Sequence, residues 1–166
     1  MQSPGWGLKQ ELYLLIGIVN TNSLLQRGHM RLTSFTDYGL RMLMRMASAP
    51  DRAFSTAELA VEFGLSRNHL AKIMQRLAGG GIVETRRGGA GGAVLCKAPE
   101  AIRLGDVVRL LEQGQPLVEC LGPTGGQCTI EGCCRLKLRL RRAEARFVED
   151  LNQSTLADVS LPRLAA

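Results

Sequence analysis

The chain has 166 residues, which suits one domain, or a small domain with an appendage. Apolar residues make up 45% of it, which excludes wholesale disorder, and aromatic residues only 4%, which argues against an aromatic-lined sugar or single-strand binder. Lys and Arg number 21 against 15 Asp and Glu, a formal net charge of +6. No apolar run approaches the roughly 18 residues that a membrane span needs. Five cysteines, an odd number, favour free thiols in a reducing compartment, here the cytoplasm.

The positive charge is concentrated in the middle of the chain. Residues 30–97 contain ten Lys and Arg against five Asp and Glu, whereas residues 98–166 contain nine of each. Such a segment fits either a polyanion partner or a solvated basic surface. Residues 1–29 carry little charge, and we expect them to be a non-native or disordered extension ahead of Met30. An extra helix packing on the body is the alternative.

Three helices are predicted in the central segment. Apolar residues at helical spacing predict the first over residues 36–49, where Pro50 ends it. Ser55 or Thr56 can cap a second, short helix. Gly64 then allows the chain to reverse in a left-handed conformation, and Ser66 caps the third helix. A small residue, then glycine, then leucine at this spacing is typical of a helix-turn-helix.

The third helix has two distinct faces. Leu70, Ile73 and Leu77 form an apolar face, and polar side chains occupy the others. Such polar side chains can reach base edges and phosphates in the major groove of DNA, although an ordinary surface helix is the alternative. The predicted DNA contacts of this helix are Ser66, Arg67, Asn68, His69, Lys72 and Gln75.

A glycine-rich hairpin is predicted after the third helix. Strand-like residues 82–87 and 93–97 flank the glycine-rich stretch 88–92. Arg86 and Arg87 at its base are further predicted DNA contacts, because a basic hairpin beside a recognition helix suits the minor groove or the phosphates. No Lys-Ser/Thr follows the glycines, which excludes a nucleotide-phosphate loop. We expect Cys96, in the second strand, to be a small buried residue.

The C-terminal segment combines a helix, a cysteine-rich loop and a longer helix. An amphipathic helix is expected over residues 102–111, and a loop follows to about Glu131. Beyond it, apolar residues recur every three or four positions over five turns: Leu136, Leu140, Ala143, Phe147 and Leu151. A narrow apolar stripe needs a partner, and a second copy of the chain is the simplest one. A homodimer would also present two recognition helices to a palindromic site.

Four cysteines lie within fifteen residues, namely Cys120, Cys128, Cys133 and Cys134. A zinc site is disfavoured because the chain lacks short Cys-x-x-Cys pairs, so a disulfide switch and an iron–sulfur cluster are the stronger readings of composition. A thiol enzyme would pair a cysteine with a histidine. His69 belongs to the predicted DNA-contacting helix, and His29 belongs to the expected N-terminal extension of residues 1–29. We therefore predict that the chain is not an enzyme.

Several blocks of sequence, in this order, resemble the Rrf-type winged-helix family of iron–sulfur regulators. They are residues 30–41, residues 66–70, the Arg-Gly-Gly of the hairpin, residues 102–108 and residues 134–137. The resemblance extends from residue 30 to about 159, and the Asn-His pair of the third helix points to the family's nitric-oxide-sensing repressors. It implies a mainly α fold with a small β wing.

Domain boundaries follow from this resemblance. The winged helix-turn-helix DNA-binding domain spans residues 30–97, and a helix with the cysteine-rich cluster-binding loop spans residues 98–134. A long C-terminal dimerisation helix covers residues 135–159, and residues 160–166 form a tail.

The resemblance also implies a cofactor and a function. The cofactor is an iron–sulfur cluster, [2Fe-2S] or [4Fe-4S], held by Cys120, Cys128 and Cys134, with Cys133 as a substitute and Asp37 from the other subunit. Without the resemblance, Asp37 reads as a first-turn helix charge. The implied function is that of a homodimeric transcriptional repressor in the nitrosative stress response, which leaves operator DNA when nitric oxide modifies its cluster. Two alternatives stay open: a family member sensing iron–sulfur or redox status, and a cluster-free thiol-switch regulator.

Overall fold

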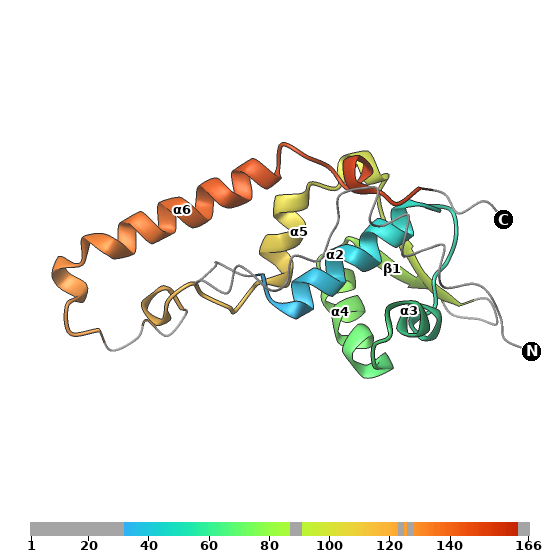
Figure 1. The fold of residues 1–166 in the computed structure, drawn as a ribbon, viewed down its shortest axis with the longest axis horizontal. Helices are drawn as coiled ribbons and strands as arrows, with labels where there is room; N and C mark the ends of the chain where they lie inside the picture. The colour runs from blue at the N-terminus through green and yellow to red at the C-terminus, as the bar shows by residue number, and fades with distance from the viewer. Residues whose placement is uncertain (1–31, 87–90, 123–124, 126–127, 163–166) are drawn as a thin grey trace, which may run out of the picture. The chain divides into compact units, whose positions relative to one another are not determined.

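The computed structural model describes residues 32–86, 91–122, 125 and 128–162 of the chain. Contacts divide the chain into Met1–Arg31 and Leu32–Ala166, and the expectations for residues 1–29 lie outside the described residues. The second unit confirms the predicted fold class, five α-helices with one two-stranded sheet in its described part (Figure 1). Its elements are α2 (Ser34–Ala47), α3 (Thr56–Phe63), α4 (Arg67–Gly79), β1 (Val83–Arg86), β2 (Gly92–Leu95), α5 (Leu104–Leu111) and α6 (Arg135–Leu151), with the short 3-10 helices η1 (Pro99–Ala101), η2 (Glu119–Leu121), η3 (Glu131–Cys133) and η4 (Ala157–Val159).

Side-chain caps begin the first three helices. The hydroxyl of Thr33 accepts from the backbone N–H of Thr36, so α2 begins and ends two residues earlier than predicted. The hydroxyl of Ser55 caps α3 and that of Ser66 caps α4, as the sequence indicates. Gly64 between them has φ of 66°, the left-handed conformation that glycine adopts without steric cost.

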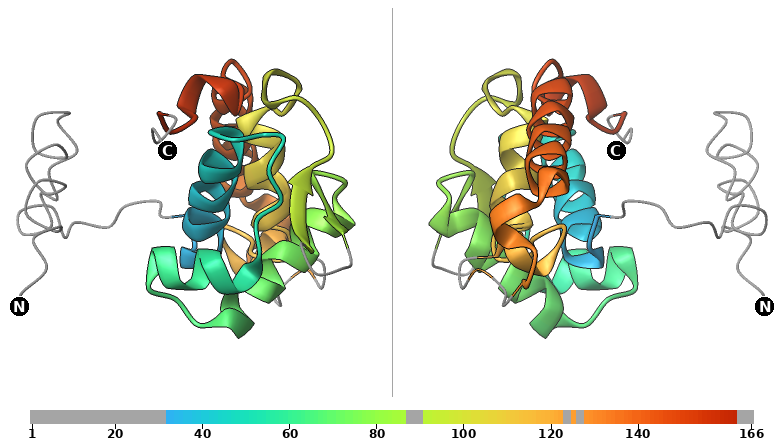
Figure 2. Two further views of the ribbon diagram at one scale, coloured as in Figure 1. Left: turned by 90° about the vertical axis from the view of Figure 1, so that its right-hand side faces the viewer. Right: turned by 90° about the vertical axis from the view of Figure 1, so that its left-hand side faces the viewer.

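The hydrophobic core lies between α2, α3, α4 and α5. Each helix contributes fully buried side chains, among them Leu43, Leu59, Leu70 and Val107. In Figure 2, α2 and α4 are seen from two opposite sides with α5 packed beside them. Burial of this apolar face holds the polar face of α4 outward, because a helix cannot rotate without exposing the leucines.

The hairpin is an antiparallel pair in which Val83 lies opposite Leu95. Phe54, just before α3, pairs with Ala93 through two backbone hydrogen bonds of 2.8 and 2.9 Å. A Cβ on Gly92 would lie 2.8 Å from the backbone of Phe54, so only glycine fits there. The expectation that Cys96 is buried is wrong: β2 ends at Leu95, and the thiol is exposed beyond it.

Helix α6 is shorter than the predicted dimerisation helix of residues 135–159. It ends at Leu151, and the chain then folds back toward α2, where Leu156 is fully buried (Figure 1). Leu156 N–H donates to Ile102 O at 2.8 Å, and Leu161 N–H donates to Met44 O at 3.4 Å. Burial of this leucine in the core explains the early end of the helix. Among the described helices, none is long and apolar enough to cross a membrane.

Candidate nucleic-acid interface and cysteine segment

The exposed face of α4 carries most of the predicted DNA contacts. Asn68, Lys72 and Gln75 are all exposed, one turn apart along the helix, whereas Leu70 and Ile73 on the other face are fully buried. Arg67 is exposed at the first turn. Amide groups can bond base edges and cations can bond phosphates, so this face has the chemistry for reading a groove.

The other predicted contacts differ in their surroundings. Ser66 is exposed, but its hydroxyl is already used as the cap of α4. Arg86 is exposed on β1 and pairs with Glu84 at 3.1 Å, a pair that water screens and that a phosphate could replace. Arg87 lies outside the described residues. Arg86 is therefore the predicted DNA contact of the wing that the structure describes.

His69 is turned inward, unlike the neighbours with which it was grouped. Its ring meets Phe35 edge-on at 6.1 Å and Tyr38 at 5.7 Å between centroids. The Nε2 atom is buried and has no hydrogen-bond partner among the described residues. In this conformation the imidazole packs α4 against α2, because the helix turn carries residue 69 to the flank of the exposed face. Its predicted DNA contact stays a prediction.

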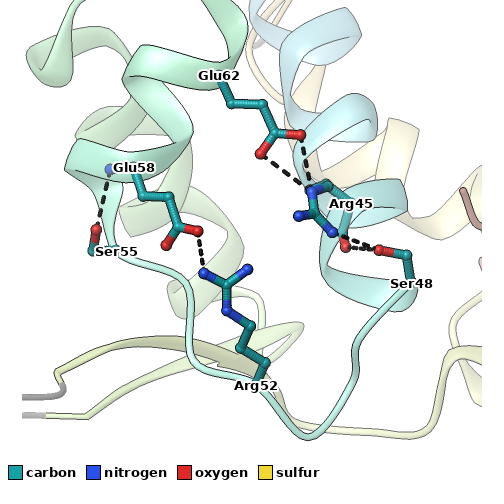
Figure 3. Close-up of polar contacts among 6 residues, drawn as sticks. All are labelled: Arg45, Ser48, Arg52, Ser55, Glu58 and Glu62. Carbon is teal, nitrogen blue, oxygen red and sulfur yellow. Dashed lines mark hydrogen bonds and ion pairs between the residues drawn. The ribbon is translucent and has the colours of Figure 1, made fainter. Parts of the chain in front are cut away.

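Two arginines, one at the end of α2 and one in the loop that follows it, pair with carboxylates of α3 (Figure 3). Arg45 Nε lies 2.9 and 3.2 Å from the two carboxylate oxygens of Glu62, and its Nη1 donates to Ser48 at 2.8 Å. Arg52 pairs through Nη2 with one carboxylate oxygen of Glu58, in the first turn of α3. Both guanidinium groups also lie over the ring of Phe54, at 5.2 and 4.7 Å from its centroid. The two ion pairs thus hold α3 to the end of α2 and to the loop that precedes α3.

These pairs decide where the positive charge of the central segment is available. Arg41, Arg45, Arg52 and Arg86 each face a carboxylate. In the described part of the segment, the cations without a polar partner are Arg67 and Lys72 on α4 and Lys97 beyond the wing. The unpaired charge therefore lies mainly on the recognition helix, where the sequence alone showed only a diffuse excess.

Arg76 has a role that the sequence did not indicate. Its Nη1 donates to Leu110 O at 3.5 Å, to Gln113 O at 3.4 Å and to Gln113 Oε1 at 3.2 Å. A cavity of about 590 Å³ lies at this junction of α4 and α5, lined also by Lys72 and Gln75. The partners are separated from Arg76 by more than thirty residues of chain, so periodicity gives no signal for them.

The four cysteines of residues 120–134, which we name the cysteine segment, are free thiols. Cys120 lies in η2, Cys133 ends η3, and Cys134 is the N-cap residue of α6; Cys133 is exposed and the other three are half-buried. Thiolates are the donors that iron–sulfur clusters use, so the donor chemistry fits. Throughout the described residues, however, no three His, Cys, Asp or Glu side chains are gathered as a metal site. The ligand set stays a prediction.

Asp37 lies in the first turn of α2, at the edge of the helix-turn-helix. Its carboxylate pairs with Arg41 at 2.9 Å, and 48% of the side chain is exposed. It is thus an i,i+4 helix pair, worth about 0.3–0.5 kcal/mol, which a stronger partner can displace. Its accessibility fits the predicted role as a ligand from the other subunit, which stays a prediction as well.

Comparison with known families decides the class of the protein. Residues 32–161 match the Rrf2 family, described as iron-dependent transcriptional regulators. The chain belongs to the Rrf2 family. Members of this family are transcriptional regulators, which agrees with the expectation of a regulator and not an enzyme.

Solved structures of related proteins share the fold. The B. subtilis global cysteine regulator CymR (YrzC) is 28% identical, with a TM-score of 0.61 over 80% of this chain and 97% of that one. IscR of T. potens is 25% identical, with a TM-score of 0.60 over 78% of this chain and 85% of that one. The oxidized form of Staphylococcus aureus CymR is 26% identical, with a TM-score of 0.58 over 77% of this chain and 94% of that one.

Proposed function

We propose that this chain is a homodimeric repressor that binds operator DNA through α4 and the wing and senses a signal at the cysteine segment. The observation that carries the proposal is the exposed face of α4, where Asn68, Lys72 and Gln75 stand beside unpaired Arg67. Two such helices related by a two-fold axis would meet successive major grooves of a palindromic site.

The N-terminal half of α6 supports the dimer. Leu136 is 62% exposed and Leu138 53% exposed, whereas Val148 near the other end of the helix is buried against α5. Figure 1 shows this half of α6 extending past α5. A second copy of α6 would cover the stripe that runs from Leu136 through Leu140 and Ala143 by knobs-into-holes packing, whereas Leu138 lies on another face of the helix.

Nitric oxide is the proposed signal and an iron–sulfur cluster the proposed cofactor. Cys120, Cys128 and Cys134 would hold the cluster, Cys133 could replace Cys134, and Asp37 would come from the partner. This assignment rests on the resemblance to the nitric-oxide-sensing repressor NsrR and on the family's description as iron-dependent. A bound cluster would supply iron that reacts with nitric oxide. To act as a ligand, Asp37 has to leave Arg41, which costs little because both side chains are about half exposed.

A cluster-free thiol switch is the second candidate, favoured by the similarity to CymR, one of whose structures is an oxidized form. The step would join Cys128 and Cys134: two thiols form one disulfide, and their two protons and two electrons reduce hydrogen peroxide to two waters. Both thiols are free and half-buried, which supports this disulfide as well as it supports a cluster. The remaining alternative is a regulator that senses iron–sulfur status, and the similarity to IscR supports it.

The DNA-binding part of the proposal is tested with single substitutions on α4. Asn68→Ala should weaken binding by about 1–3 kcal/mol at one base position and relax sequence preference there. Lys72→Ala should weaken binding to all sequences and lower the salt slope of log K by about 1. Arg109→Gln on α5, an exposed arginine that pairs with Asp106 and is not a predicted DNA contact, serves as the control. Equal losses in all three variants would contradict the assignment.

The sensor is tested by purification without oxygen, followed by visible absorption, iron and sulfide assays, and operator binding with and without nitric oxide. Coloured, iron-containing protein that releases the operator on exposure to nitric oxide supports the first candidate. Colourless protein that releases it after peroxide treatment and recovers with a thiol reductant supports the second. Cys128→Ala should abolish either response, whereas Cys96→Ala, an exposed cysteine outside the segment, should not.

The ligand from the partner is tested separately with Asp37→Ala. The variant should fold normally, because it loses only an exposed helix pair. We expect weaker iron retention or a weaker response to nitric oxide. Wild-type behaviour in both measurements would remove Asp37 from the ligand set.

A further inference from the structure

The last turn of α5 and the residues after it, 110–113, contact both the start of α2 and the recognition helix. Glu112 Oε1 accepts a hydrogen bond from the backbone N–H of Thr33 at 2.8 Å and from its hydroxyl at 3.0 Å. Thr33 is the cap of α2, so the carboxylate lies at the positive end of that helix. The start of α2, which carries Asp37, is thus held by the end of α5.

The recognition helix is held by the same turn from another side. Arg76 of α4 donates to the carbonyls of Leu110 and Gln113, which are acceptors that a helix end leaves without an intrahelical partner. A Cβ on Gly80, just after α4, would lie 2.2 Å from Leu110 Cδ2, so the two helices are in tight contact here. Movement of residues 110–113 therefore has to move α4 or break these contacts.

Six residues, 114–119, connect this turn to the cysteine segment. The chain passes through Gly114, at φ of 89°, to η2 and Cys120, and η2 contacts α6. One short stretch of backbone is consequently bonded to the start of α2, to the recognition helix and to the chain that carries the thiols.

We propose that residues 110–113, the relay turn, transmit the state of the cysteine segment to the recognition helix. Glu112 and Arg76 are its positioning residues: the first fixes the turn to α2, and the second fixes α4 to the turn. This inference rests on the proposed function, since it requires that a signal at the cysteines changes operator affinity. It gives Arg76 a role within the protein, as a contact between α4 and the end of α5.

The test compares the full-length protein before and after the signal that changes it: nitric oxide for iron-loaded protein, or hydrogen peroxide for iron-free protein. The measured quantity is the ratio of operator dissociation constants in the two states, which for coupled sites is about 5 to 150. In Glu112→Ala, the ratio of the two operator dissociation constants should be at least threefold smaller than in the wild-type protein. Glu112→Gln, which keeps an acceptor oxygen, should retain most of it. Arg109→Gln on the same helix should leave it unchanged.

Arg76→Gln separates positioning from DNA contact. If Arg76 is a positioning residue, Arg76→Gln should lower the ratio of the two operator dissociation constants. The salt dependence of operator binding by the variant, measured before the signal, should then equal that of the wild-type protein. A slope reduced by about 1 would show a phosphate contact and overturn the assignment of Arg76. A wild-type ratio in both Glu112→Ala and Arg76→Gln would overturn the relay turn as a whole.

Hydrogen exchange on the wild-type protein gives a measurement that depends on no variant. The signal should speed amide exchange at residues 104–113 and in α4, and leave β1 and β2 unchanged. Unchanged exchange in α4, with operator affinity lowered, would overturn the relay while leaving the proposed function standing. A wild-type protein whose operator affinity ignores both nitric oxide and peroxide would instead overturn the proposed function, and the relay with it.

Discussion

Two regions differ in how far their apolar side chains are buried: the DNA-reading head, residues 32–95, and the region from Leu117 to Leu138. In the head, Leu43 and Leu70 are fully buried, and ion pairs brace the helix-turn-helix (Figure 3). In the other region, Ile130 is 58% and Leu136 62% exposed, and the four thiols are free. A single chain thus supplies enough contacts to shape the head, whereas the second region has apolar surface and donor atoms available for a partner chain and a cofactor.

The first prediction contrasts two leucines. Leu70→Ala should lower the free energy of unfolding by about 2–5 kcal/mol, because it leaves a cavity in the core of the head. Leu136→Ala should change it by no more than about 0.5 kcal/mol at concentrations where the protein is monomeric. Chemical denaturation measures both. A large loss for Leu136→Ala in the monomer would show that the exposed leucine is packed within its own chain.

The second prediction concerns two glycines. A Cβ on Gly105 would lie 2.1 Å from the carbonyl oxygen of Val148, so Gly105→Ala should force α5 and α6 apart and cost about 1–3 kcal/mol. Gly132 in the cysteine segment has open space around it, and Gly132→Ala should stay within about 0.5 kcal/mol of wild type. Thermal unfolding of the two variants checks this, and equal effects would contradict the packing described for α5 on α6.

The third prediction contrasts two arginines. Only 12% of the Arg45 side chain is exposed, and it bonds Glu62 and Ser48, so Arg45→Gln should cost about 1 kcal/mol. Arg139, exposed on α6, should tolerate the same change with an effect near zero. Denaturant midpoints distinguish the two outcomes. If Arg45→Gln proves neutral, the ion pair does not stabilise the position of α3.

The fourth and smallest effect concerns the chain that folds back after α6. Hydrogen bonds from the backbone N–H and hydroxyl of Thr155 hold the pKa of Asp158 below its ordinary value of 3.8. A lowered folded-state pKa means that the carboxylate stabilises the fold above pH 3.8 and that this contribution is lost as pH falls through the folded pKa. Asp158→Asn should therefore lower the melting temperature slightly at pH 7, and its difference from wild type should shrink as pH falls below 3.8. A difference that does not shrink in acid would contradict this origin.

Much of the head could be predicted because its signals are local. A serine cap, a glycine in the left-handed conformation and a leucine repeat each act within a few residues, so Ser66, Gly64 and Leu70 indicated α4 and its orientation. The same reasoning was wrong for Cys96, because its exposure depends on where the strand pairing stops. It also gave no sign that the His69 ring packs edge-on against aromatic rings of α2, and the DNA contact of His69 stays a prediction.

The sequence by itself determined the order of the helices, their caps, the wing and the polar composition of the recognition face, because helix periodicity and capping are short-range effects. Only the tertiary structure decided that Arg45 pairs with Glu62, that Arg76 bonds the end of α5, and that Glu112 bonds the start of α2. These contacts join residues 17 to 79 positions apart. No local pattern encodes such a pairing, since it exists only after the core has brought the helices together.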